Sequence, residues 1–139
     1  PSLFLSDLTP WREEGSDCPL VLIFFNLRCA GCISRGLPFA AELRSMYPEI
    51  SFLAIHSSFG HPEHQKDQPV LQAIGTLNLG IPVAIDQGKT TFDHYKAEGT
   101  PHWIILDSTG QVLYSIFGST DGSRLKIELA LRELSSTSV

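Results

Sequence analysis

Leu20–Cys32, which reads LVLIFFNLRCAGC, is the stretch of sequence that decides the fold. Its first six residues are continuously apolar and do not alternate with polar ones, which predicts a central strand buried on both faces. Two cysteines separated by two residues follow at once, and a helical pattern begins at Ala30. The sequence therefore predicts a strand, a short turn and a helix, with a Cys-x-x-Cys motif where the helix begins.

The patterns that follow extend this unit into a larger sheet. Apolar residues at helical spacing predict a helix over 30–47, which Pro38 should kink. Further elements are expected as a strand over 50–55, a loop over 60–69, a helix over 70–79, an edge strand over 81–85, a helix over 90–97 and a hairpin of strands 103–106 and 112–116. A last helix is expected over 123–134, with apolar positions Leu125, Ile127, Leu129, Leu131 and Leu134.

Strand order and length give the fold class. The first two strands can pair in parallel through the helix between them, whereas the hairpin must be antiparallel. We therefore expect an α/β fold with a mixed central sheet flanked by helices on both faces. Residues 1–18 should form an N-terminal extension anchored by Leu8 and Trp11.

The composition excludes several classes of function. A chain of 139 residues with 42% hydrophobic and 18% charged residues suits one soluble globular domain, expected as a monomer. The net charge of −5 argues against a nucleic-acid partner, and no apolar run is long enough to span a membrane.

The cysteine count bears on the compartment. Three cysteines cannot build a disulfide framework, and Cys18 is left over beside the Cys-x-x-Cys pair. A cysteine outside a disulfide favours a reducing compartment, and the first residues lack the pattern of a signal peptide. These features predict a cytoplasmic protein; an exported protein whose signal has been removed is the alternative.

The position of the cysteine pair suggests redox chemistry. At the start of a helix the first sulfur faces free backbone N–H groups that favour negative charge. Cys29 is thus the expected nucleophile and Cys32 the resolving thiol. Moving a thiol pKa from about 8.5 to about 7 needs roughly 2 kcal/mol, whereas the helix end supplies only about 0.3–1 kcal/mol. Arg28 is the fixed positive charge in the motif, so we expect it to favour the Cys29 thiolate.

Other uses of a Cys-x-x-Cys motif fit less well. Ile33 stands where c-type haem attachment needs histidine. A zinc site would need further ligands, and the spacing of the candidates does not match a known zinc motif. Those candidates are Cys18, His56, His61, His64 and His102. We expect neither a metal nor a cofactor, and we expect Cys18 to be a quiet thiol.

Two segments, 24–32 (FFNLRCAGC) and 98–110 (EGTPHWIILDSTG), resemble the thioredoxin-like superfamily, and most closely its TlpA/ResA-type and NHL-repeat-associated branches. The likeness covers roughly residues 19–134. It implies a single thioredoxin-like domain over 1–139, with an inserted helix and strand within 56–86. It also implies a cis peptide bond at Thr100-Pro101 beside the cysteines, a Thr100 backbone that pairs with an extended substrate, and a Pro101 that keeps metal ions off the dithiol.

The chain departs from the family at three positions. Arg28 replaces a tryptophan common before the first cysteine, and Ile23 replaces the buried acid of thioredoxins proper. Pro38 falls six residues after Cys32, where relatives usually have five. These changes bear on redox poise, substrate choice and the rate of the resolving step.

The resemblance implies a thiol–disulfide oxidoreductase that reduces or exchanges disulfides in protein partners, served by an upstream thiol reductant or oxidant. A peroxiredoxin-like peroxidase is one alternative, although Asn26 occupies the place of its threonine. A non-catalytic binding module is another. The expected site has Cys29 and Cys32 as catalytic residues, supported by Arg28, Ala30, Gly31, Thr100 and Pro101.

Overall fold

The computed structural model describes residues 18–57, 72, 75, 80–86 and 89–137. Within these residues five strands form one mixed sheet of order β3-β2-β1-β4-β5. The neighbours β1 and β2, and β2 and β3, run parallel, whereas β4 is antiparallel to both β1 and β5. The strands are β1 (Leu20–Phe25), β2 (Ser51–His56), β3 (Val83–Ile85), β4 (His102–Leu106) and β5 (Val112–Phe117).

The predicted α/β architecture with a mixed sheet is confirmed, and β1 spans the six residues expected of it. All six of its side chains are buried because β1 lies in the middle of the sheet and is covered on both faces. The short strand β3 lies at an edge, and Pro82 precedes it, so the proline breaks no pairing inside the sheet.

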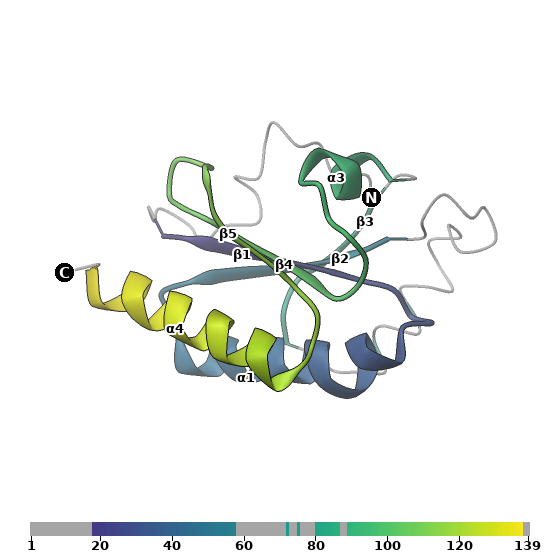
Figure 1. Cartoon of the computed structure of the whole chain (residues 1–139), viewed down its shortest axis with the longest axis horizontal. Helices are drawn as coiled ribbons and strands as arrows, with labels where there is room; N and C mark the ends of the chain where they lie inside the picture. The colour runs from purple at the N-terminus through teal and green to yellow at the C-terminus, as the bar shows by residue number, and fades with distance from the viewer. Residues whose placement is uncertain (1–17, 58–71, 73–74, 76–79, 87–88, 138–139) are drawn as a thin grey trace.

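Helices cover the sheet from both sides (Figure 1). Helices α1 (Leu37–Met46) and α4 (Asp121–Thr137) lie side by side on one face, and the short α3 (Thr90–His94) lies on the other. Odd-numbered residues of β1 pack with α1 and α4, while even-numbered ones pack with Phe92 of α3. The two buried clusters are therefore separated by the sheet itself.

The helix after the cysteines differs from the prediction in one respect. A π-helical segment, η2 (Cys32–Gly36), begins at the second cysteine of the motif and leads into α1. It is closed by a hydrogen bond from the Leu37 N–H to the Cys32 carbonyl. Pro38 follows directly, in the first turn of α1. Because proline lacks an N–H and its ring crowds the preceding turn, a wider turn accommodates it.

The predicted apolar face of the last helix is partly wrong. Leu125 and Leu129 are 56% and 51% exposed, whereas Ile127, Ala130 and Leu131 are buried. Since 127, 130 and 131 follow the i, i+3, i+4 rule, they share one side of α4, and Leu125 and Leu129 fall outside it.

Several predictions concern residues outside the described part of the chain. They include the N-terminal extension with Leu8 and Trp11, the loop over 60–69 and most of the helix over 70–79, of which only Gln72 and Gly75 are described, both helical.

The helix predicted over 90–97 is shorter and ends at His94. None of the described helices is long and apolar enough to cross a membrane.

Candidate active site

The loop between β1 and the cysteine motif is organised by Asn26. Its buried carboxamide donates a hydrogen bond from Nδ2 to the Ser57 carbonyl at 2.6 Å and accepts one at Oδ1 from the Arg28 N–H at 2.8 Å. The Asn26 carbonyl accepts a hydrogen bond from the Cys29 N–H at 3.0 Å. One buried side chain thus ties the end of β1 to the segment after β2 and folds the chain back toward Cys29.

Cys29 occupies the cap position of the helix that follows. Its carbonyl accepts a hydrogen bond from the Ile33 N–H, and its Sγ accepts one from the Cys32 N–H at 3.2 Å. The same N–H also donates to the Cys29 carbonyl at 3.1 Å, so the sulfur shares a helix-start N–H with that carbonyl, and this contact favours negative charge on the sulfur. The geometry therefore has the features expected of a nucleophilic thiol.

Thr100 approaches Cys29 from a distant part of the chain. The Cys29 thiol donates a hydrogen bond to the Thr100 carbonyl over 3.4 Å, although 71 residues separate them. Cys29 is partly exposed, and so is Thr100. A partner sulfur that bonds to Cys29 would therefore lie against the Thr100 backbone.

Cys32 has a different environment. It is fully buried in the cluster that contains Ile23, under the α1 face of the sheet. Burial of the thiol, followed by its hydrogen bond with Cys29, raises the pKa of Cys32 to about 12, although hydrogen bonds involving Asn26 and Thr100 act in the opposite sense. Cys32 is thus held as a protonated thiol behind a more accessible Cys29.

Pro101 packs against the cysteine segment. The Thr100–Pro101 peptide bond is cis, which is the isomer implied by the resemblance. A Cβ atom at Gly36 would lie 3.2 Å from the Cβ and Cγ of Pro101, and one at Gly31 would lie 4.0 Å from its Cδ. Gly36 therefore allows the π-helical segment to lie close to the proline ring, whereas 4.0 Å at Gly31 is an ordinary contact distance.

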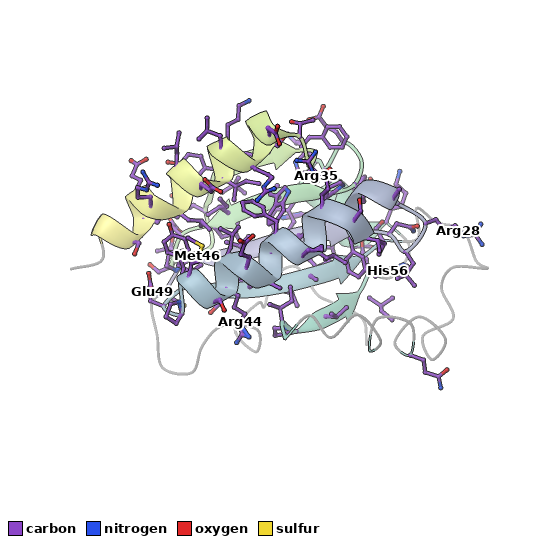
Figure 2. The ribbon with its side chains drawn as sticks, turned by 90° about the horizontal axis from the view of Figure 1, so that it is seen from below. Arg28, Arg35, Arg44, Met46, Glu49 and His56 are labelled. Carbon is purple, nitrogen blue, oxygen red and sulfur yellow. The ribbon has the colours of Figure 1, made fainter. Side chains whose placement is uncertain are left out.

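Arg28 and Ala30 lie on the outside of the site. Both are exposed, and Figure 2 shows the Arg28 side chain extending away from the helix that carries the cysteines. The influence of Arg28 on Cys29 remains a prediction, since the contact fixed by the structure is that of its backbone N–H with Asn26.

The candidate histidines serve the scaffold. His102 is buried; it accepts a hydrogen bond at Nδ1 from the Glu98 N–H and has Nε2 2.8 Å from Ser115 Oγ. It neighbours Phe117, away from the Cys32 cluster. His56 accepts a hydrogen bond from the Leu27 N–H at 3.4 Å and packs edge-on against Phe25. His56 therefore supports the same loop as Asn26.

The third cysteine is remote from the pair. Cys18 is buried, and its Sγ lies 3.1 Å from Ser51 Oγ. It precedes the start of β1, whereas Cys29 follows the end of that strand. His61 and His64 lie outside the described residues. Within the described ones, no three His, Cys, Asp or Glu side chains form a group that could hold a metal ion.

A mixed five-stranded sheet, a Cys-x-x-Cys motif opening the first helix and a proline loop facing it define a class of protein. The chain belongs to the thioredoxin-like superfamily and resembles its TlpA/ResA-type branch. No protein-family model matches the chain.

Individual relatives support this class. A thiol-disulfide isomerase from Corynebacterium glutamicum is 26% identical and superimposes with a TM-score of 0.75, covering 89% of this chain and 82% of that one. A secreted Mycobacterium tuberculosis disulfide oxidoreductase homologous to E. coli DsbE shares the fold, at 17% identity, a TM-score of 0.66 and coverage of 94% and 93%. Protein DipZ of Mycobacterium bovis and M. tuberculosis is 27% identical over 132 residues, covering 84% of this chain but only 18% of DipZ.

Sequence reasoning missed Asn26 as a support of the site, whereas His56, at the end of a strand, was expected to be a packing or capping residue and is one. The signal available for Asn26 was a polar residue directly after a buried strand, which is where loop-organising side chains occur. No sequence signal linked His56 to Leu27, because that contact depends on the pairing of β1 with β2.

Proposed function

We propose that this protein is a thiol–disulfide oxidoreductase that uses Cys29 and Cys32 to reduce or exchange disulfides in protein partners. One observation supports this most strongly: Cys29 Sγ, partly exposed, accepts the helix-start N–H of Cys32 and lies 3.4 Å from the Thr100 carbonyl. The more accessible sulfur is thus the one whose contacts favour negative charge, and the Cys32 thiol is buried behind it.

The cycle follows from this arrangement. The Cys29 thiolate attacks a partner disulfide, forms a mixed disulfide and releases one partner thiolate, which takes up a proton. The Cys32 thiol then loses its proton and attacks Cys29 Sγ, which releases the second partner thiol and leaves a Cys29–Cys32 disulfide. Two electrons pass to the partner, and an upstream dithiol returns them; the reverse sequence oxidises a partner.

The raised pKa of Cys32 gives the two thiols separate roles. At neutral pH the buried thiol is protonated and does not compete for the partner disulfide. Burial, the largest cause of the raised pKa, persists in the mixed disulfide, whereas the hydrogen bond and the charge of Cys29, which also raise the pKa of Cys32, are removed when Cys29 bonds to a partner. Loss of the Cys32 proton is therefore opposed less strongly in the mixed disulfide than in the free dithiol.

The compartment and the wider context are also proposals. We infer an exported location, the alternative named from the sequence, because the structures similar to this one include a secreted disulfide oxidoreductase; no similar protein supports the cytoplasmic expectation. The chain spans 18% of the length of DipZ, so any role drawn from that whole protein is a proposal as well.

Insulin reduction tests the function. With dithiothreitol as the reductant, the protein should accelerate precipitation of the insulin B chain, and Cys29→Ser should abolish this effect. When Cys32→Ser is reduced, freed of dithiothreitol and mixed with insulin, it should accumulate a mixed disulfide through Cys29, visible by mass on a non-reducing gel. Cys18→Ser is the matched control and should retain activity, since Cys18 lies beyond the opposite end of β1.

Two results would overturn the proposal. One is insulin reduction that is unchanged in Cys29→Ser. The other is Cys29-dependent turnover of hydrogen peroxide without disulfide exchange, which would favour a peroxidase. Asn26 argues against this second outcome, because its carboxamide is bonded to Ser57 and Arg28 rather than directed to Cys29 Sγ.

A further inference from the structure

We propose that His102 is a positioning residue for disulfide exchange: its neutral imidazole holds the loop 98–101 in place opposite Cys29, and a proton on the ring releases that loop. The residues 98–101 are called the proline loop below. The inference rests on the proposed function and adds a pH-dependent control of the same site. His102 acts through the backbone of the loop and not on the sulfur itself.

The proline loop is held at both of its ends. At the far end, the Pro101 carbonyl accepts a hydrogen bond from the Gly118 N–H at 2.8 Å. At the start, the Glu98 N–H donates to Nδ1 of His102 at 3.2 Å. His102 directly follows the loop and is the first residue of β4, so its side chain reaches back and ties the start of the loop to the sheet.

Thr100 lies between these two anchors. Its carbonyl accepts the hydrogen bond of the Cys29 thiol over 3.4 Å. Only Gly99 separates Thr100 from Glu98, and a glycine transmits little rigidity along the backbone. Loss of the bond between Glu98 and His102 therefore leaves the Thr100 carbonyl held from one side only.

The bond to Glu98 requires one protonation state of the ring. Because Nδ1 accepts, the neutral imidazole carries its proton on Nε2, which donates to Ser115 Oγ 2.8 Å away. A second proton would bind at Nδ1, and this nitrogen would then face the Glu98 N–H as one donor against another. Protonation of His102 thus breaks the anchor at the start of the proline loop.

The surroundings of the ring set the pH at which this occurs. His102 is buried, and its cross-strand neighbours are Phe24 on β1 and Phe117 on β5. After α3, Tyr95 packs against Phe24. The Glu98 charge favours a protonated ring, but burial opposes it more strongly, so the pKa of His102 lies below its ordinary value near 6.5. The loop is therefore held at neutral pH and released in acid.

Two kinds of substrate respond differently to this release. An extended peptide disulfide that pairs with the Thr100 backbone needs the proline loop in place, whereas a small disulfide needs only the Cys29 sulfur. Both react with the same thiolate. The ratio of their two rates therefore cancels the fraction of Cys29 that is ionised at each pH, and a change in this ratio reports the loop.

Two uncharged 2-pyridyl disulfides measure the ratio through release of thiopyridone. One carries a capped five-residue peptide with its cysteine among alanines, and the other carries mercaptoethanol. From pH 7.5 to pH 5 we expect the peptide-to-mercaptoethanol ratio of wild-type protein to fall about threefold to tenfold, the effect of one lost hydrogen bond on positioning. His102→Asn, whose Oδ1 accepts the Glu98 N–H but binds no proton, should keep the ratio level. His94→Asn changes an exposed histidine and should behave as wild type.

Nuclear magnetic resonance of wild-type protein gives a second measurement that needs neither a variant nor the reaction. The ring should carry its proton on Nε2 at pH 7.5, and the Glu98 amide should shift with the same midpoint as the ring protons of His102. A Glu98 amide that ignores this titration would overturn the proposal even where His102→Asn fails to fold.

The rates give the other decisive outcomes. A wild-type ratio that stays level down to pH 5, or a fall that persists in His102→Asn, would overturn the role of His102 and leave the proposed function standing. Wild-type protein inert toward both probes at pH 7.5 would overturn the proposed function, and the positioning role with it.

Discussion

At the scale of single residues, the buried carboxamide of Asn26 joins the end of β1, Ser57 and the Arg28 backbone N–H. Asn26→Ala would remove the carboxamide that bonds the buried Ser57 carbonyl and the partly buried Arg28 N–H. We expect unfolding free energy to fall by about 1–3 kcal/mol. We also expect alkylation of Cys29 to slow, because the loop that places its sulfur at the helix start loosens.

Measurements on two variants separate these effects. Urea denaturation measures the free energy of unfolding, and iodoacetamide labelling followed by mass spectrometry measures the rate of Cys29 alkylation. Ser34→Ala is the matched control, since its exposed hydroxyl bonds the Ala30 carbonyl and should affect neither. Normal Cys29 reactivity in a destabilised Asn26→Ala would limit Asn26 to a structural role.

Arg28 gives the second prediction at this scale. Its charge is next to Cys29 in the chain but is exposed, so its effect should be small and screened by salt. In Arg28→Ala we expect the alkylation of Cys29 at pH 7 to be slower than in wild type at 20 mM salt and to match it more closely at 1 M. The exposed Arg132, on α4, gives the control Arg132→Ala. Equal alkylation rates for wild type and Arg28→Ala at low salt would make Arg28 an ordinary surface charge.

At the scale of elements, the π-helical segment η2 lies against the proline loop at Gly36. A methyl group there would press on two Pro101 carbon atoms at 3.2 Å. Gly36→Ala should therefore lower stability by about 1–3 kcal/mol, the range for overpacking, and should reduce disulfide exchange because the loop that faces Cys29 moves.

Gly122→Ala is the matched comparison for this variant. Gly122 lies in α4, and its added Cβ would meet only Thr120 Oγ1, at 3.9 Å, so the substitution should leave stability unchanged or slightly raised. Thermal unfolding and the insulin assay measure both variants. A stable and fully active Gly36→Ala would show that the contact between η2 and Pro101 is not tight.

At the scale of the whole molecule, His102 makes stability depend on pH. Burial lowers the pKa of His102 below its ordinary value near 6.5, although the Glu98 charge opposes this. Below about pH 6.5 the unfolded chain therefore binds more protons at His102 than the folded protein does, and the folded state loses stability as the pH falls. Above that pH His102 is neutral in both states, and the folded state keeps its full stability.

The measurement is the thermal midpoint between pH 7.5 and 5. Wild-type protein should lose stability across this interval, and His102→Asn, which keeps an acceptor for the Glu98 N–H, should show a shallower slope. His94→Asn changes an exposed histidine and should leave the slope as in wild type. Equal slopes for wild type and His102→Asn would contradict the assignment.

Much of the fold followed from local patterns. The apolar run of β1, the hairpin of β4 and β5 and the helix after the cysteines were all predicted close to their observed bounds. Buried strands and amphipathic helices can be recognised from the spacing of apolar residues within a short window, because each side chain faces either the core or water. The π-helical segment and the exposed Leu125 and Leu129 were not predicted, since packing against neighbouring elements decides them.

The sequence by itself determined which residues are available for chemistry: a cysteine pair after a buried strand, and Thr100-Pro101 downstream. Only the tertiary structure decided how they meet. The pairing of β4 with β1 brings the Thr100 carbonyl to Cys29 across 71 residues, and the helix layer buries Cys32. The roles of Asn26 and His56 arise in the same way, because contacts between distant segments depend on strand order and not on local pattern.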